Sequence, residues 1–230
     1  MSDLFSAARA PELIQQRGNG AMVADRWIVL AFTWLALLIS FVDRLAWSNL
    51  ALDASRALGV GMAAVGAFVT AFYIGYVFSN AVLGFATDRI GPRIILGTGL
   101  AVLGALTFAF GLARSFIAGV CIQAAMGIAS GVDYAAGVKL ISTWFNKQQR
   151  GSALGIYLTA TSLAVVVANG AVPRLAGRWT WRGAYETLGA ATIVAGIISL
   201  LLMRNAPGAG RRPALWKSDF QCCRKSRISG

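Results

Sequence analysis

Two ionisable residues, Asp43 and Arg44, stand side by side inside the long apolar stretch FVDRLAWSNL. In a membrane-spanning helix they would lie about 24 Å beyond Trp27, within the outer half of the bilayer. Charged side chains at such depth are costly, and they typically mark a transport pathway or a binding site. The alternative is that both side chains extend to the outer interface, where Trp47 would also be stable.

The chemistry of this pair follows from its two side chains. A guanidinium binds carboxylate or phosphate groups through directed N–H donors, so Arg44 is a candidate ligand for an anionic substrate. Asp43 could carry a proton or provide an orienting hydrogen bond. Neighbouring residues on a helix point about 100° apart, so Asp43 and Arg44 are not expected to face each other.

A second buried carboxylate is predicted at Asp133, in the apolar run FIAGVCIQAAMGIASGVDYAAGVKL. A carboxylate in low dielectric holds a proton more readily than it does in water, which makes Asp133 a candidate for proton coupling. The alternative is a structural partner for Lys139 or for another helix. Gln123, in the same run, fits an interhelical hydrogen bond or a ligand contact.

The elements that must position these residues are membrane-spanning helices. Of the 230 residues, 57% are hydrophobic and only 13% are charged, and the mean hydropathy is +0.64. Soluble domains carry about 25% charged residues, so this composition excludes a soluble globular protein. Six apolar runs are each long enough to cross a bilayer. They are 27–50, 61–83, 94–113, 116–141, 151–173 and 183–203.

The positive charges predict an orientation in the cell (inner or plasma) membrane. The net charge is +12, which in a soluble protein would suggest nucleic acid as a partner. With the amino terminus in the cytoplasm, fourteen of the 21 basic residues fall on the cytoplasmic side, five fall outside and two lie within helices. This excess predicts a multi-pass protein with both termini in the cytoplasm, and no nucleic-acid partner.

The remaining organisation is simple. We expect a cytoplasmic amino-terminal arm (1–25), a six-helix transmembrane domain (26–205) and a basic, disordered cytoplasmic tail (206–230). The sequence has no histidine, no metal-ligand spacing and no nucleophile motif. We therefore expect no catalytic residue, no metal, no cofactor and no enzyme activity.

The run 116–141 is the least lipophilic of the six, and we expect neighbouring helices to shield it from lipid. Small residues and Gln123 follow one another at four-residue steps through Gly119, Gly127 and Gly131. Such a stripe allows another helix to approach closely, and helix packing is the favoured interpretation.

The gap between the second and third runs, GFATDRIGPR, resembles the G-x-L-A-D-R-x-G-R-K/R signature of the major facilitator superfamily. The matching residues are Gly84, Asp88, Arg89, Gly91 and Arg93. By this resemblance they form a gating loop that latches against the carboxy-terminal half of a carrier. Asp88 also stands where a carboxylate could cap the next helix. The implied fold is all-α, with six transmembrane helices arranged as a 3+3 inverted repeat, equivalent to half of a major facilitator.

A second resemblance narrows the branch. FVDRLAWSNLAL and STWFNKQQRGSALGIYLTATSLA are similar to segments of anion:cation symporters and related organic-anion carriers. The resemblance implies that Arg44 contacts an anionic substrate and that Asp43 takes part in proton coupling, with Asp133 as a second coupling candidate. We expect Arg44, Asn49, Tyr73 and Gln123 to line the substrate site.

Together these features predict a secondary transporter that moves a small organic anion with protons by alternating access. Carriers of the family have twelve helices, so this chain resembles the amino-terminal half and is expected to be a truncated product. If the six-helix chain is complete, a homodimer is the expected working unit. The alternative is a non-transporting membrane fragment or an assembly partner.

Overall fold

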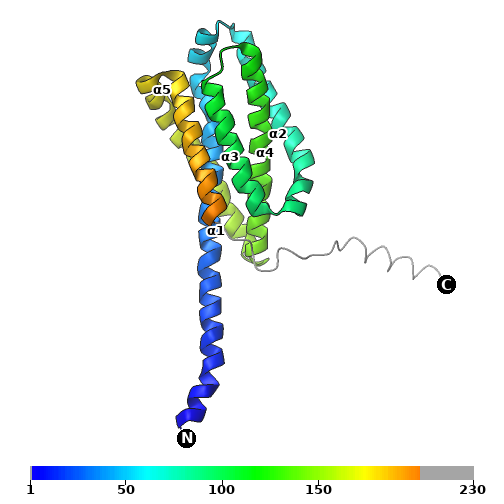
Figure 1. Cartoon of the computed structure of the whole chain (residues 1–230), viewed down its shortest axis with the longest axis vertical. Helices are drawn as coiled ribbons and strands as arrows, with labels where there is room; N and C mark the ends of the chain where they lie inside the picture. Colours follow the sequence, from blue (N-terminus) through cyan, green and yellow to red (C-terminus); the bar gives the residue numbers. More distant parts are fainter. Residues whose placement is uncertain (1, 203–230) are drawn as a thin grey trace, which may run out of the picture.

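The computed structural model describes residues 2–202, with side chains described for 25–61, 64–80, 91–131 and 133–202. In this part of the chain five α-helices, joined by short turns, form one elongated bundle (Figure 1). Their bounds are α1 Ser2–Leu58, α2 Met62–Ile90, α3 Pro92–Gly111, α4 Phe116–Trp144 and α5 Arg150–Leu202. The expected disordered tail, 206–230, lies outside the described residues.

The prediction that 84–93 forms a loop is wrong for its first seven residues. Helix α2 continues to Ile90, and only Gly91 separates it from α3. Gly91 has φ 104°, a backbone conformation that glycine adopts without a steric penalty. Pro92 then begins α3, where its missing N–H costs nothing. Gly91 is therefore the N-cap of α3, whereas Asp88 lies within α2.

The fifth and sixth apolar runs are joined in one long element, α5, rather than separated by a gap at 174–182. Fifty-three residues of helix would extend about 80 Å, far more than a bilayer core of about 30 Å. The element is interrupted at Thr180, whose φ of 78° and ψ of 166° are not helical. The chain reverses direction there, at the yellow end of the bundle in Figure 1. The parts 150–179 and 181–202 are each long enough to cross a membrane.

Close contacts give the relative directions of the helices. The second part of α5 runs antiparallel to α3, because Gly97, Gly104 and Gly111 meet Leu200, Ile193 and Arg182 in turn. Helices α2 and α4 run parallel to each other. The first part of α5 runs parallel to α1, because Arg26 bonds Gln149 at 3.2 Å and Trp34 bonds Thr159 at 3.0 Å.

The predicted shielding of the fourth apolar run is confirmed. Gln123, Ser130 and Asp133 on α4 are all buried. The glycine stripe packs as expected: a Cβ on Gly131 would lie 2.9 Å from Ser79, and one on Gly127 would collide with the α2 backbone at Phe72. The small residues of α4 thus allow α2 to pack closely against it.

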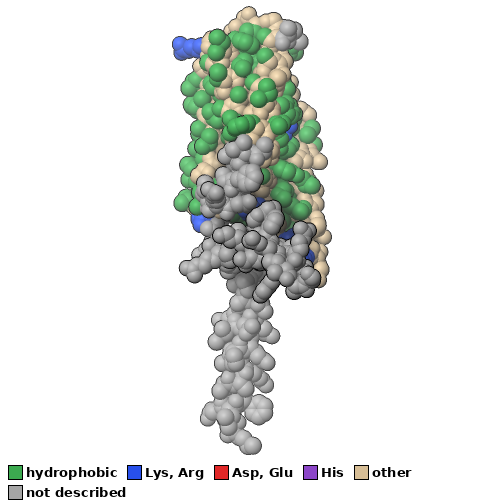
Figure 2. Space-filling model, turned by 90° about the vertical axis from the view of Figure 1, so that its right-hand side faces the viewer, with side chains coloured by type: hydrophobic (Ala, Val, Ile, Leu, Met, Phe, Trp, Pro, Cys, Tyr) green, Lys and Arg blue, Asp and Glu red, His purple; other side chains and the backbone are tan. Residues whose placement is uncertain are grey.

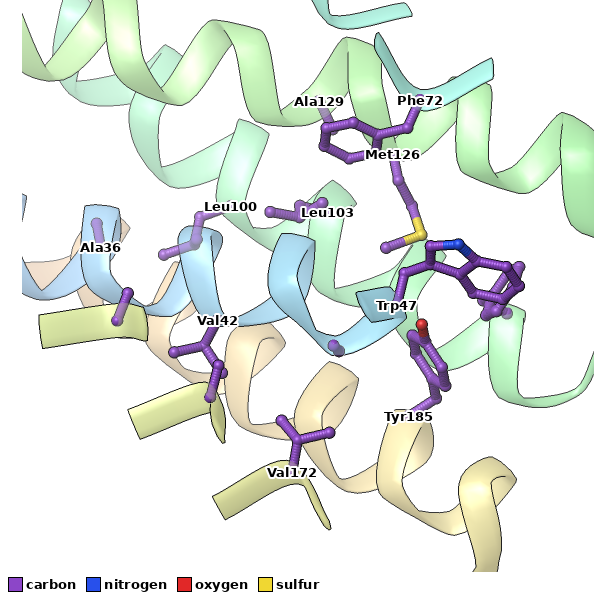
Figure 3. Packing of buried hydrophobic residues seen from close by; sticks show 14 of the residues in the cluster. Ala36, Val42, Trp47, Phe72, Leu100, Leu103, Met126, Ala129, Val172 and Tyr185 are labelled. Carbon is purple, nitrogen blue, oxygen red and sulfur yellow. The ribbon is translucent and has the colours of Figure 1, made fainter. Parts of the chain in front are cut away.

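An apolar interior and an apolar exterior complete the bundle. Inside, aromatic rings pack around Trp47, whose centroid lies 4.6 Å from that of Phe68; Figure 3 shows the Tyr185 hydroxyl pointing towards Trp47. Outside, hydrophobic side chains cover the face drawn in Figure 2, and Lys and Arg gather mainly near its ends. Four helical segments of the described chain are long and apolar enough to cross a membrane: Asp25–Leu58, Pro92–Gly111, Phe116–Trp144 and Arg150–Leu202. A shorter apolar segment lies at Ala64–Asn80.

Candidate functional site

Arg44 lies on the side of α1 that faces α2, and aromatic rings surround its guanidinium. Nη2 donates a hydrogen bond to the Tyr73 hydroxyl at 2.8 Å. The ring centroids of Tyr73, Tyr76, Phe41 and Phe72 lie 4.8–5.6 Å from the guanidinium carbon. Aromatic faces stabilise a cation without occupying its N–H donors, of which a guanidinium has five.

Arg44 lines a small cavity of about 90 Å³ between α1, α2 and α4. Of the four predicted substrate-binding residues, Arg44, Tyr73 and Gln123 meet there, while Asn49 does not line it. Asn49 instead donates a hydrogen bond to the backbone oxygen of Leu45 at 3.2 Å, within its own helix. The remaining lining residues are mainly apolar or aromatic: Leu45, Trp47, Ser48, Phe68, Val69 and Phe72.

Asp43 is buried on a different side of α1, against α3 and the second part of α5. Its Oδ2 accepts hydrogen bonds from Thr192 at 2.8 Å and from Thr107 at 3.2 Å. Its Oδ1 is also buried and has no partner among the described residues. With an exposed fraction of 2%, Asp43 does not extend to the outer interface, so that alternative is wrong for this side chain.

Asp133 is the second buried carboxylate, with an exposed fraction of 1%. Neither of its oxygens has a hydrogen-bond partner among the described side chains, so it does not form the pair with Lys139 considered above. The carboxylate lies against α3, where a Cβ on Gly99 would be 2.5 Å from Oδ1. Ser40 lies beside it and shares a 3.2 Å hydrogen bond with Ser130.

The predicted gating-loop residues are only partly described. Gly84, Asp88 and Arg89 lie in α2, and the side chains of Asp88 and Arg89 lie outside those that the structure describes. Gly91 forms the turn between α2 and α3. Arg93 Nη2 donates to the backbone oxygen of Leu200 at 2.5 Å, which places a cation at the carboxyl end of α5.

Sequence patterns did not identify the hydroxyl partners of Asp43. Thr107 and Thr192 are fully buried polar residues within two apolar runs. A polar residue inside an apolar run was the signal that could have marked each threonine as a candidate partner. Their pairing with Asp43, however, depends on the packing of helices that are far apart in sequence. In the described part of the chain, no group of three or more Cys, Asp or Glu side chains could hold a metal ion.

Residues 32–228 match the sequence profile of the Major Facilitator Superfamily. The chain belongs to the major facilitator superfamily. The match covers most of the chain, and it agrees with the family resemblance of GFATDRIGPR. This is a family of transporters and not of enzymes, and its members are multi-pass membrane proteins.

Relatives of this major facilitator chain include two bacterial transporters. It is 29% identical over 193 residues to the "Probable L-galactonate transporter" of Escherichia coli K12, covering 84% of this chain and 42% of that protein. It is 28% identical over 158 residues to the "Hexuronate transporter" of Bacillus subtilis 168, covering 69% and 37%. The chain therefore spans less than half the length of the relatives it matches.

A solved structure supports the fold assignment. The bundle superimposes with a TM-score of 0.76 on the inward-facing, unoccupied crystal structure of a bacterial homologue of the human lysosomal transporter Spinster. The superposition covers 87% of this chain and 49% of the other, at 20% sequence identity. The structure is therefore an all-helical bundle that corresponds to about half of a major facilitator fold.

Proposed function

We propose that this chain provides the anion-binding half of a secondary transporter that moves a small organic anion together with protons by alternating access. The observation that carries the proposal is the position of Arg44. Its half-buried guanidinium lines an open cavity between α1, α2 and α4 and is held by Tyr73 and surrounding aromatic rings. An ionised group at such a place is costly unless it binds a ligand or a partner.

The chemistry of the cavity favours a carboxylate-bearing ligand with hydroxyl groups. Arg44 offers a planar set of donors that suits a carboxylate, and Tyr73 and Gln123 add polar groups beside it. L-galactonate and hexuronates, which the two relatives are named for, are carboxylates of this kind. We therefore assign sugar acids as the substrate class.

Asp43 and Asp133 are the proposed proton sites. Each carboxylate is buried and has at least one oxygen without a partner among the described residues. Neutralisation by a proton makes such a group compatible with an apolar interior, so reversible protonation is a suitable coupling step. The two groups are close enough to interact electrostatically.

The proposed topology has six membrane crossings in a 3+3 arrangement. The protein would lie in the inner or plasma membrane, with both termini in the cytoplasm. Alternating helix directions and the break at Thr180 support six crossings. The fourteen-to-five distribution of basic residues supports the orientation. We include gating by the turn at Gly91 and by Arg93 in the same proposal. If the six-helix chain is complete, the proposed working unit is a homodimer.

Ligand binding and uptake by the 230-residue chain test this function. The protein would be purified in mild detergent, and its thermal unfolding measured with L-galactonate, D-glucuronate, glucose 6-phosphate and uncharged galactose. Saturable stabilisation by the two sugar acids, but not by galactose, is expected, followed by saturable uptake into liposomes. No stabilisation by any of the acids would overturn the anion-binding proposal. Stabilisation without uptake, in monomers and dimers alike, would favour the non-transporting assembly partner.

A further inference from the structure

A second polar site lies within the bundle, away from the Arg44 cavity. It contains two groups that are fully buried and come from different helices: the Asp133 carboxylate of α4 and the Tyr157 hydroxyl of α5. Neither Asp133 oxygen nor the Tyr157 hydroxyl has a hydrogen-bond partner among the described residues. Unsatisfied buried polar groups cost roughly 1–3 kcal/mol each, so three such atoms together require an explanation.

Glycines create the space that these two groups occupy. The Tyr157 hydroxyl lies directly against Gly137, at a position that a Cβ there would fill. The Asp133 carboxylate lies in the same way against Gly99 of α3. Gly137 follows Asp133 by one helical turn, so the two polar groups are on the same side of α4. The Thr33 methyl group of α1 would lie 3.1 Å from the same Cβ position on Gly137.

The surroundings of this pair are rich in oxygen atoms. Ser40 of α1 and Ser130 of α4 bond to each other at 3.2 Å beside the carboxylate. The titratable groups that interact with Asp133 or Tyr157 are Asp43 of α1, Tyr76 of α2 and Tyr134 of α4. All are carboxyl or phenol groups, and the site therefore suits a small guest that can both donate and accept hydrogen bonds.

We propose that Asp133 and the Tyr157 hydroxyl bind internal water within the bundle, and that Tyr157 is thereby the positioning residue for the proton carried by Asp133. The Tyr157 hydroxyl lies against Gly137, which is one helical turn from Asp133 on α4. Buried water typically makes about three hydrogen bonds to polar groups that are otherwise unsatisfied, as here. This inference rests on the proposed function in one respect, which is that Asp133 carries a proton.

Infrared difference spectra of the full chain in lipid nanodiscs test the proposal without measuring transport. The carboxyl C=O band of protonated Asp133 is the band lost in Asp133→Asn, and internal water gives O–H bands that shift in heavy-oxygen water. In Tyr157→Phe we expect the Asp133 band to move and at least one internal-water band to disappear. An unchanged Asp133 band with unchanged water bands would overturn the proposal.

The matched control is Tyr185→Phe. Tyr185 is also fully buried and its hydroxyl also lacks a partner among the described residues, but the carboxylate with which it interacts electrostatically is Asp43. This variant should leave the Asp133 band in place; an equal shift in both variants would overturn the assignment to Tyr157. Gly137→Ala, which displaces the hydroxyl without removing it, should reproduce the Tyr157→Phe change. If the unsubstituted chain showed no anion uptake while these spectral results held, the proposed transport function would be overturned and the water site would not.

Discussion

Asp43 and Arg44 are consecutive residues of α1 whose side chains reach different neighbours. Asp43 accepts hydrogen bonds from Thr107 of α3 and Thr192 of α5, whereas Arg44 donates to Tyr73 of α2. The 100° turn between neighbouring helix positions produces this separation. In the transporter we propose, substrate and proton would therefore bind on different sides of one helix, and movement of α1 could couple them.

Removal of the Arg44 charge should abolish saturable sugar-acid uptake and weaken binding by about tenfold or more, because hydrogen bonds to a charged group contribute roughly 1.5–3 kcal/mol. Arg44→Lys should restore only part of the affinity, since an ammonium lacks the planar donor set. Thermal-shift titration and liposome uptake measure both effects. Arg56→Ala, at an exposed arginine of the same helix, is the control. Normal uptake by Arg44→Ala would contradict the assigned role.

Asp133→Asn should remove the stimulation of uptake by external acid while leaving insertion into the membrane intact. An amide has the shape of the carboxylic acid but cannot release a proton, so the response to pH is lost. Uptake measured across a series of external pH values gives the result. Asp53, an exposed carboxylate on α1, supplies the control Asp53→Asn. Undiminished acid stimulation in Asp133→Asn would show that this carboxylate does not couple protons.

The threonines that hold Asp43 should contribute to stability in a pH-dependent way. Thr107→Val and Thr192→Val each remove a hydroxyl that donates to Oδ2 with little change of shape. Because such donors favour the ionised carboxylate, the loss of stability, about 1–3 kcal/mol for each, should be greater at alkaline than at acid pH. Thermal unfolding in detergent at both pH values tests this. An equal loss at both would indicate packing alone.

Gly104→Ala should destabilise the bundle by about 1–3 kcal/mol, because the new Cβ would lie 2.5 Å from the Ile193 nitrogen and 2.8 Å from the Gly189 oxygen. These are backbone atoms of α5, which cannot move aside as a flexible side chain can. Gly151→Ala is the control, since nothing lies within 4 Å of its Cβ position. Unfolding temperatures compare the two, and a Gly104→Ala protein as stable as the control would contradict the close crossing of α3 and α5.

The proposed orientation predicts opposite accessibility of two loops. After Cys121, Cys222 and Cys223 are replaced by Ser, single cysteines would be introduced at Arg114 and Lys147. A membrane-impermeant maleimide applied to intact cells should label position 114 and not 147. Labelling of position 147 alone would show that the topology is the reverse of the one proposed. Labelling of both positions would show that α4 does not cross the membrane between them.

Sequence alone determined the apolar elements and the residues that do not belong in them. The bilayer requires about twenty consecutive apolar residues for each crossing, so the runs and the exceptions within them, Asp43, Arg44 and Asp133, are visible in one dimension. The glycine stripe of α4 was equally visible, since its four-residue spacing reflects the helical period alone. The sequence did not determine the exact ends: α2 continues to Ile90, because a single glycine with positive φ is enough to turn the chain.

The tertiary structure decided which of the polar and charged residues within the apolar runs contact one another. Asn49 was expected beside Arg44, but the helical period directs it to its own backbone, while Phe41, Phe72 and Tyr76 supply the rings around the guanidinium. Pairing of Asp43 with Thr107 and Thr192 joins residues separated by 64 and 149 positions. Such contacts depend on the direction, depth and rotation of packed helices, which hydropathy does not encode. Only the folded bundle therefore places Arg44 in a cavity and Asp43 within the packed interior.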